Sequence, residues 1–480
     1  MASKIIEQLL DLSASEKRKF LSFVASPYLN KHEKTLELVS LVLEREDVIS
    51  IIEDQPYLFS LIFPNTPYQE QLLHNLLSYL KKLYHKFIAF EQLNIQNYTE
   101  ELNALEYSYA HNQWDFFINR SKALSKTLSQ TSLKDSNYHF TNYKMNSLLG
   151  YHQSAFHDRT KTVHFQAMMD HLDLFFLQEK LKHSCHLKAN MDIANTHYEL
   201  RLLDQIITFL ESEDSHYLND PIIKLYYTIY KTMEKERSEP YYLKLQEILA
   251  ADLSNYPNEA TQDLYTFSYN YCIRQINTGN EGFKRELFQL YQKGLNNGLL
   301  LENDILSEWD YKNITTLGCN LEEFDWTLTF IENFRNHLPS NRQENAYNFA
   351  LGLWHFSKGR YDDALNALQL VQYTDVKYHI STTFLTIRTF YEKQDTEALM
   401  SLLETFRIYV IRNKKIPTVE KRGYSNFVRF TKHLVNLVHQ PYAYSSQEFQ
   451  KKLNKLQTNI ENTAELINKN WLLSEILKQN

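Results

Sequence analysis

Glycine and proline are scarce in this chain, whose 480 residues include only 9 glycines and 10 prolines. Glycine most readily adopts the positive φ that phosphate-binding loops, tight hairpins and the nucleophile elbows of hydrolases require. A chain with so little glycine, and with apolar residues at helical spacing, is expected to form one helix after another. The same scarcity disfavours most catalytic loops, so we expect a binding protein and not an enzyme.

Cysteines and catalytic motifs are also few. The three cysteines, Cys185, Cys272 and Cys319, are far apart and odd in number, which argues against a disulfide framework and against a zinc ribbon. The sequence contains no GxxxxGK followed by Ser or Thr, and no GxGxxG, GxSxG, HExxH or CxxC motif. We expect no catalytic residue, no cofactor and no bound metal.

An excess of positive charge and a long apolar run are missing as well. The net charge is −7, so no basic field points to nucleic acid or to anionic lipid, and we expect neither as a partner. No stretch approaches the roughly 18 apolar residues of a membrane span. The first residues, Met1–Glu7, carry charge where a signal peptide needs an apolar run. These features predict a soluble, cytoplasmic protein.

Aromatic residues, in contrast, are abundant, with 33 Tyr and 28 Phe among 43% hydrophobic residues. That apolar content excludes a disordered chain. Because one compact core stops growing at roughly 250–300 residues, the chain needs several domains or a core spread along a solenoid. Tyrosine suits the shallow interfaces between stacked helices, since its ring can be buried while its hydroxyl stays in water.

Residues 1–98 are predicted to form a separate N-terminal helical domain. Ser13–Glu16 offers capping hydroxyls to a helix that ends at Ser26-Pro27, and a second helix follows from about Glu33 to Glu46. The strongest amphipathic pattern follows the loop at Phe63–Pro67. Its apolar stripe is made of residues three or four apart: Leu72, Leu76, Leu80, Leu83, Phe87 and Phe90, with Leu73, Leu77, Tyr84 and Ile88 beside them.

This amphipathic helix, Gln71–Phe90, leaves an alternative function open. It could belong to a helix-turn-helix that contacts nucleic acid, with Lys81, Lys82 and Lys86 as the available cations. Residues 1–100 are net acidic, whereas a DNA-binding element normally clusters Lys and Arg against phosphates. The alternative is a regulatory protein whose N-terminal domain contacts nucleic acid and whose repeats sense a ligand.

Residues 99–440 show helix pairs separated by short polar breaks, for example at Asn219–Pro221, Asn255–Asn258 and Pro339–Asn341. Helix pairs at near-regular spacing indicate a solenoid, in which each pair buries its apolar face against its neighbours. We expect residues 441–480 to form helices that cap the end of this array.

The clearest repeat is Leu351–Leu365, which reads Leu-Gly-Leu-Trp-His-Phe-Ser-Lys-Gly-Arg-Tyr-Asp-Asp-Ala-Leu. It resembles a tetratricopeptide (TPR) repeat. The resemblance implies that the pair Leu351-Gly352 lets two helices approach closely and that Gly359 forms the turn. It also implies that Tyr361 lies between helices and that Ala364 marks a tight crossing.

The spacing recurs on both sides of this segment, so that the clearest repeats span 308–413. The earlier unit lies 37 residues before Leu351–Leu365, and the later unit lies 34 residues after it. The earlier unit also contains a true Leu-Gly pair, Leu317-Gly318, which is three residues out of phase with this spacing. The corresponding residues are Ile314-Thr315, Phe324, Thr327 and Pro339 in the earlier unit, and Leu385-Thr386, Ala398 and Leu399 in the later one.

The resemblance implies an all-α fold built as a right-handed superhelical solenoid, in which the first helix of each pair lines a concave face. Such a face would bind a peptide or a helix of a partner protein, which predicts a scaffold or an adaptor. In the alternative interpretation, the aromatic rings on this face pack between neighbouring pairs. The implied concave-face positions are Trp309, Lys312, Thr316, Asn320, Phe349, Leu353, Phe356, Ile387, Phe390 and Tyr391.

The chain as a whole also resembles an uncharacterised family of long helical bacterial proteins. The resemblance is carried by Ser26–Lys31, Tyr198–Asp204 and Phe406–Lys414. That family has no assigned activity, so this resemblance supports the fold and implies nothing about mechanism.

Histidines are crowded between residues 139 and 197. His157, His164 and His171 recur every seven residues, which places them on one face if a single helix contains them, and His183, Cys185, His186 and His197 follow. One interpretation is a transition-metal or pH-sensing site. However, a seven-residue step separates side chains by roughly 10 Å along a helix, which is too far for one ion. We favour histidines on polar faces and at helix interfaces.

Basic residues cluster in the C-terminal third, with aromatic residues between them. This basic patch could bind an acidic peptide, a phosphate or RNA. Alternatively, the aromatic residues form a buried face while the cations stay solvated, which we favour because the net charge is negative. The basic patch comprises Arg407, Arg412, Lys414, Lys415, Lys421, Arg422, Arg429 and Lys432.

Overall fold

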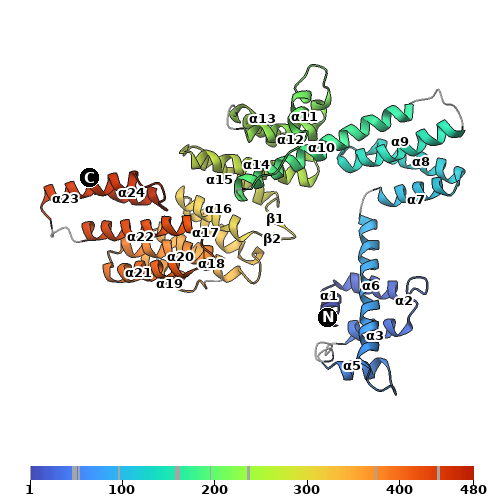
Figure 1. Cartoon of the computed structure of the whole chain (residues 1–480), viewed down its shortest axis with the longest axis horizontal. Coiled ribbons are helices and arrows are strands. Elements are labelled where there is room, and N and C mark those ends of the chain that lie inside the picture. Colours follow the sequence, from blue (N-terminus) through green and yellow to red (C-terminus); the bar gives the residue numbers. More distant parts are fainter. Residues whose placement is uncertain are drawn as a thin grey trace. The chain divides into compact units, whose positions relative to one another are not determined.

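The computed structural model describes residues 2–45, 51, 54–95, 98–156, 163–194, 196–234, 238–372, 376–439 and 444–479. In these residues the protein is all-α, and the only strands are two of two residues each (Figure 1). None of the described helices is both long enough and apolar enough to cross a bilayer. The chain divides into two compact units, residues 1–226 and 227–480.

The first unit begins with five helices around a core of their own. These are α1 (Ala2–Leu10), α2 (Ala14–Ala25), α3 (Glu33–Glu44), α5 (Gln55–Ile62) and α6 (Glu70–Ile95). Ser13 and Glu16 form the capping box of α2, as expected from the sequence, and α2 ends before Ser26-Pro27. One apolar cluster draws only on residues 5–87, including Leu73, Leu80 and Phe87 of α6.

The amphipathic stripe of α6 is buried as predicted, except at its C-terminal end. There, Ile88 and Phe90 are 44% and 55% exposed, although the periodicity placed both among the apolar residues of the stripe. Helix α2 still contacts this end of α6, since the ring centre of Phe23 lies 6.2 Å from that of Phe90 and Lys19 pairs with Glu91, but Ile88 and Phe90 stay exposed.

The remainder of the first unit is a second group of helices. These are α7 (Thr99–Ala110), α8 (Trp114–Gln130), α9 (Ser136–Phe156), α10 (Val163–Ala194), α11 (Leu203–Leu210) and α12 (Pro221–Thr232), with a 3-10 turn η1 (Tyr217–Asn219); the unit boundary falls within α12. The long helices α9 and α10 pack along each other, and α7 contacts both α8 and α9.

The second unit continues the succession of paired helices. Its elements are α13 (Ser238–Ala250), η2 (Leu253–Asn255), α14 (Asn258–Asn277), α15 (Phe283–Asn296), β1 (Leu301–Glu302), β2 (Ile305–Leu306), α16 (Glu308–Asn320), α17 (Phe324–Asn333), η3 (Arg335–His337), α18 (Gln343–Ser357), α19 (Tyr361–Gln369), α20 (Val376–Glu392), α21 (Thr396–Arg412), α22 (Thr418–Val438), α23 (Ser446–Glu461) and α24 (Lys469–Leu477).

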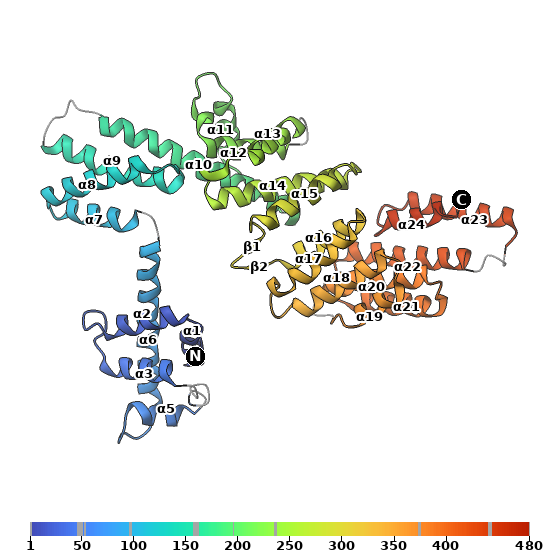
Figure 2. The same ribbon diagram turned by 180° about the vertical axis from the view of Figure 1, so that it is seen from behind.

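Helices of the second unit pack against their neighbours in the chain and also against alternate helices. From α13 to α24, nearly every helix contacts the next one, and α18 also contacts α16 and α20 (Figure 2). The apolar clusters follow the same order, since one draws on residues 242–354, another on 349–385 and a third on 376–476. Each part of the core is thus built from residues close in sequence, the arrangement in which a helix pair is stabilised by adjacent pairs.

Two glycines allow the paired helices to approach closely. A Cβ on Gly352 of α18 would lie 2.7 Å from Leu368 Cδ2 of α19, which agrees with the role expected of the Leu351-Gly352 pair. A Cβ on Gly318 of α16 would lie 2.2 Å from Thr327 Oγ1 of α17. A close approach in the earlier pair therefore occurs at Gly318, three residues after Thr315, the position that the 37-residue spacing assigns to the glycine.

Turns with positive φ are formed mostly without glycine. Asn303 and Asp304 both have positive φ, 51° and 65°, and join β1 to β2 in a two-residue hairpin. Two consecutive residues with positive φ are typical of a type I′ turn, in which asparagine and aspartate are tolerated. The inference that scarce glycine excludes tight hairpins is therefore wrong at this position.

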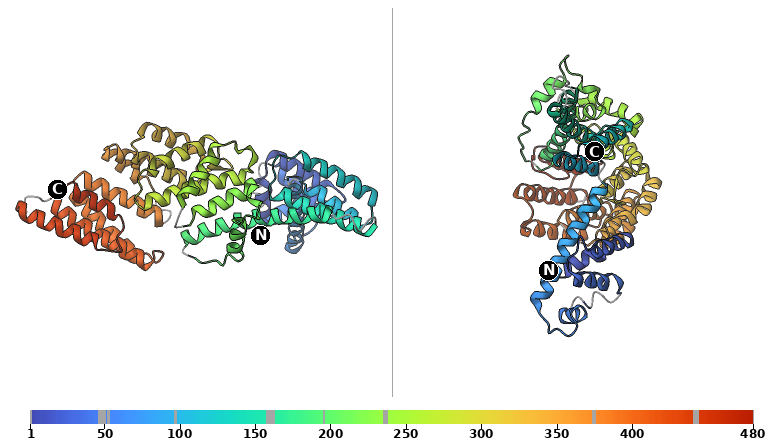
Figure 3. Two further views of the ribbon diagram at one scale, coloured as in Figure 1. Left: turned by 90° about the horizontal axis from the view of Figure 1, so that it is seen from above. Right: turned by 90° about the vertical axis from the view of Figure 1, so that its right-hand side faces the viewer.

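The C-terminal end of the chain is formed by α22, α23 and α24. The helices α23 and α24 pack against each other and both contact α22, and their red ribbons lie next to one another in Figure 3. Leu472 and Ile476 of α24 are fully buried in the same apolar cluster as Leu399 and Leu403 of α21. The end of the helix array is thereby covered.

Candidate interaction surface

The predicted concave-face positions lie on α16, α18 and α20, and they differ widely in exposure. Trp309 and Asn320 are exposed, and Trp309 is 41% accessible. The half-buried positions are Lys312, Thr316, Leu353, Phe356 and Phe390. Phe349, Ile387 and Tyr391 are buried, so these three pack between helices and contribute no open surface.

Lys312 of α16 brings part of this set together. Its Nζ lies 5.0 Å from the ring centre of Phe349, 5.8 Å from that of Trp309 and 6.0 Å from that of Tyr378. The same Nζ donates a hydrogen bond of 2.7 Å to Ser381 Oγ. Since these residues come from α16, α18 and α20, the cluster links three alternate helices through cation–π and polar contacts.

Tyr378 and Ser381 were not expected from the repeat pattern. They lie on α20, nine and six residues before the predicted position Ile387, and they meet Lys312 only because α20 packs beside α18. Tyr378 is buried, and its ring centre is 6.0 Å from both Trp309 and Phe349.

Tyr391 is covered by the C-terminal helix. The ring of Trp471 in α24 packs edge-on against Tyr391, with 5.4 Å between the ring centres. Arg388, one turn earlier on α20, lies between Phe356 and Trp471, at 5.3 and 6.0 Å from their ring centres. Burial lowers the pKa of Arg388 and raises that of Tyr391. Neither Arg388 nor Trp471 was expected from the repeat pattern, because their contact joins distant segments.

Carboxylates neutralise part of the basic patch. Glu404 accepts hydrogen bonds from Arg407 at 2.6 Å and from Lys432 at 2.8 Å, and these bonds hold the pKa of Glu404 at about 2. Arg422 pairs with Glu465 across the turn that precedes α24, at 2.6 Å.

Other cations of the patch contact the chain itself. Lys421 Nζ donates to the carbonyl oxygen of Ile411 at the end of α21, and Arg429 lies 4.6 Å from the ring centre of Phe430. Arg412, Lys414 and Lys415 are exposed and make no ion pair with any described residue. Within the patch, the exposed cations that make no ion pair with a described residue are therefore Arg429 on α22 and these three residues near the α21–α22 turn.

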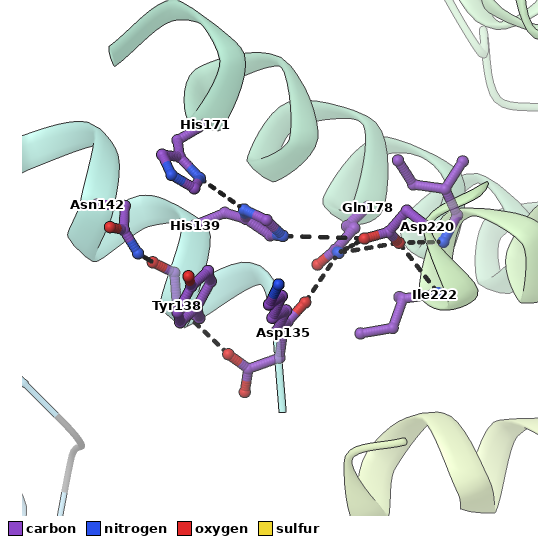
Figure 4. A network of polar contacts seen from close by, with 10 residues as sticks. Asp135, Tyr138, His139, Asn142, His171, Gln178, Asp220 and Ile222 are labelled. Atoms are coloured by element: carbon purple, nitrogen blue, oxygen red, sulfur yellow. Dashed lines mark hydrogen bonds and ion pairs between the residues drawn. The ribbon is translucent and has the colours of Figure 1, made fainter. Parts of the chain in front are cut away.

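The histidine-rich segment contributes a buried polar network between α9, α10 and the start of α12 (Figure 4). His139 Nδ1 and His171 Nδ1 are 2.9 Å apart, so one ring donates and the other accepts. On its other side, His139 Nε2 is 3.8 Å from Asp220 Oδ2. Gln178 Nε2 donates hydrogen bonds to the carbonyl oxygen of Lys134 and to the carboxylate of Asp220. Asp220 in turn caps α12, because it accepts hydrogen bonds from the backbone N–H groups of Ile222 and Ile223.

The pKa of His171 is lowered to about 4, first by burial and then by the neighbouring His139. Its ring is therefore neutral near pH 7, as the hydrogen bond between the two rings requires. His164, seven residues earlier, bonds Asn146 Oδ1 at 2.9 Å, so both histidines face α9 as their spacing predicts. In the described residues no three histidine, cysteine or acidic side chains converge on a point where a metal could bind.

Two other histidines of this segment, His183 and His197, lie at the surface. His183 pairs with Glu179 on the same helix at 3.1 Å, and His197 is exposed. Cys185 is buried, and its thiol lies 3.4 Å from the carbonyl oxygen of Tyr226. His157 lies outside the described residues.

The three cysteines are free and buried. Burial raises the pKa of Cys272 to about 12 and that of Cys319 to about 11. Because the thiolate is the reactive form, both groups stay in the unreactive thiol form near neutral pH. Cys272 lies 3.1 Å from the hydroxyl of Tyr242, which donates to Glu286 Oε1 at 2.5 Å, so this group is part of the packed core between α13, α14 and α15.

Comparison of the chain with protein-family models, with curated proteins and with solved structures yields no match.

Proposed function

We propose that this protein is a non-enzymatic interaction scaffold whose helix pairs form a TPR-like, right-handed solenoid and bind a peptide or helix of a partner protein. The observation that carries the proposal is the stripe on α16 formed by Trp309, Lys312, Thr316 and Asn320, which keeps solvent access along its length. These positions follow steps of three and four residues, so they share one helix face.

The neighbouring helix supports a continuous contact area. α16 and α18 pack together, and the half-buried Leu353 and Phe356 lie on α18. Tryptophan often contributes most to binding at the centre of a protein interface, and Trp309 is exposed at the start of this stripe. Lys312, held against Trp309 and Phe349, adds positive charge and so favours a partner segment that carries acidic residues.

Site-specific photo-crosslinking tests this proposal. A photoreactive amino acid at Asn320 should give a defined crosslinked product in extracts of the source cells. The same residue at Thr329, an exposed position on α17 of the same helix pair, should not give that product.

A second comparison shows whether the product depends on the stripe. Trp309→Ala should abolish it, whereas Leu370→Ala, which removes an apolar side chain that is 65% exposed, should leave it unchanged. Equal products from Asn320 and Thr329, or a product insensitive to Trp309→Ala, would show that the stripe on α16 is not the contact surface.

A further inference from the structure

A depression between α1 and α6 combines an apolar floor with a basic rim. Its volume is about 390 Å³, and it is lined by Lys4, Ile5, Gln8, His74, Leu77, Ser78, Lys81 and His85. The four polar residues from α6, which are His74, Ser78, Lys81 and His85, are spaced by four, three and four positions and so lie along one face of the helix, and Lys4 and Gln8 are one turn apart on α1. The two helices are in contact, so their polar side chains converge on the same space.

The floor of the depression is formed by Ile5 and Leu77, which are 4% and 5% exposed. A concave space of this size, with apolar walls and a few convergent polar groups, has the character of a small-molecule site. The apolar floor favours a ligand that has a hydrocarbon or aromatic body.

The rim carries positive charge that no carboxylate of the lining offsets. Lys4 and Lys81 make no ion pair with any described residue, and no acidic residue is among those that line the depression. Glu70 lies one turn before the lining residue His74 on α6, and its Oε1 is 4.0 Å from His74 Nε2. An anion between the two ammonium groups would relieve their mutual repulsion.

The number of hydrogen-bond donors that line the depression favours some anions over others. A phosphate monoester carries a charge of about −1.5 to −2 at pH 7 and three acceptor oxygens, which matches two lysines with further donors from Ser78 and the histidine rings. A monocarboxylate would neutralise only one lysine. We propose that the depression between α1 and α6 binds a small organic phosphate monoester, with its phosphate at Lys4 and Lys81 and its apolar body on Ile5 and Leu77. This site uses none of the residues on which the scaffold function depends.

Calorimetric titration of the full chain with phenyl phosphate tests the site. We expect saturable binding of one equivalent, weaker binding of inorganic phosphate, which lacks the apolar body, and no binding of phenol, which lacks the anion. Absence of saturable binding of phenyl phosphate would overturn the proposal. Equal affinity for inorganic phosphate would overturn its assignment to an organic monoester.

Two pairs of lysine variants separate the site from general electrostatic attraction. Lys4→Ala combined with Lys81→Ala should weaken the binding of phenyl phosphate about tenfold or more, since charge-assisted hydrogen bonds are lost. Lys82→Ala combined with Lys86→Ala removes the same charge from exposed positions of α6 outside the depression, and should change the affinity less than about twofold. An equal loss in both pairs would show that the anion is attracted by net charge and not bound at this site. Lys81, Lys82 and Lys86 lie in the middle of α6, Lys4 lies near the start of α1, and all four side chains are exposed. Circular dichroism of both double variants should therefore show an unchanged fold.

Discussion

The hydrogen bond between His139 and His171 predicts a loss of stability at mildly acidic pH. Burial and the neighbouring His139 lower the pKa of His171 from 6.5 to about 4. Between these two values the unfolded chain binds a proton at His171 and the folded chain does not. The free energy of unfolding is therefore largest above pH 6.5 and falls as the pH decreases toward 4.

The size of the effect follows from the shift in pKa. Each unit corresponds to about 1.4 kcal/mol, so the shift to about 4 sets an upper limit of roughly 3 kcal/mol, and solvent screening of the half-buried ring reduces the expected loss to about 1–2 kcal/mol. A loss of this size should be detectable in one part of the protein, because α9 and α10 can open without unfolding the rest of the chain.

Amide hydrogen exchange of α9 and α10, corrected for the intrinsic pH dependence of exchange, measures this loss. His171→Gln keeps a hydrogen-bonding side chain beside His139, but this side chain does not titrate. Amide protection in α9 and α10 of this variant should therefore depend less on pH than in the unmodified protein. His183→Gln serves as the control, since His183 lies on the same helix with its side chain 64% exposed. If the unmodified protein and His171→Gln lose protection equally over this pH range, the buried neutral histidine is not the cause.

Three further outcomes follow from the packing of the second unit. Gly318→Ala should destabilise the α16–α17 pair, because overpacking costs about 1–3 kcal/mol and outweighs the gain in helix propensity of about 1 kcal/mol. In a Thr327→Ala variant, Gly318→Ala should leave the stability of the α16–α17 pair unchanged or increase it. Amide hydrogen exchange in α16 shows whether Gly318→Ala lowers or raises that stability in each background. Cys272 and Cys319 should be alkylated by iodoacetamide at pH 8 on the order of a hundredfold more slowly in the folded than in the denatured chain, and equal rates by mass spectrometry would contradict the raised pKa values. Trp471→Ala should cost about 3–5 kcal/mol locally and accelerate exchange in α24, and unchanged protection there would show that this ring does not hold the helix in place.

Much of the helical architecture could be predicted from local sequence patterns. The capping box at Ser13, the helix stop before Pro27 and the apolar stripe of α6 are all signals that lie within a few residues of one another. The close approach at Gly352 was also predictable, since it depends on a helix pair joined by a short turn. The hairpin at Asn303-Asp304 was missed, because residues other than glycine take its positive-φ positions.

The candidate surface was less predictable than the fold. The TPR resemblance assigns Trp309, Lys312 and Phe349 to one face, and Lys312 Nζ lies 5.8 and 5.0 Å from the ring centres of Trp309 and Phe349. Spacing could not show that Tyr391 lies under Trp471, because α24 is far from α20 in the sequence and their contact depends on how the last helices fold back. Sequence patterns singled out Leu77 and Lys81 on α6 but could not show the depression between α1 and α6, since Lys4 and Lys81 come together only through the packing of those two helices.

By itself, the sequence determined that this chain is a succession of amphipathic helices with short polar turns, because periodicity, capping and helix breaking act between residues that are neighbours in the chain. Only the tertiary structure decided which cations pair with carboxylates and which aromatic rings stay exposed to solvent. Lys432 reaches Glu404 from the following helix, and Arg422 reaches Glu465 beyond the end of α23. Charge pairing and exposure depend on which side chains meet across helices, and no local pattern carries that information.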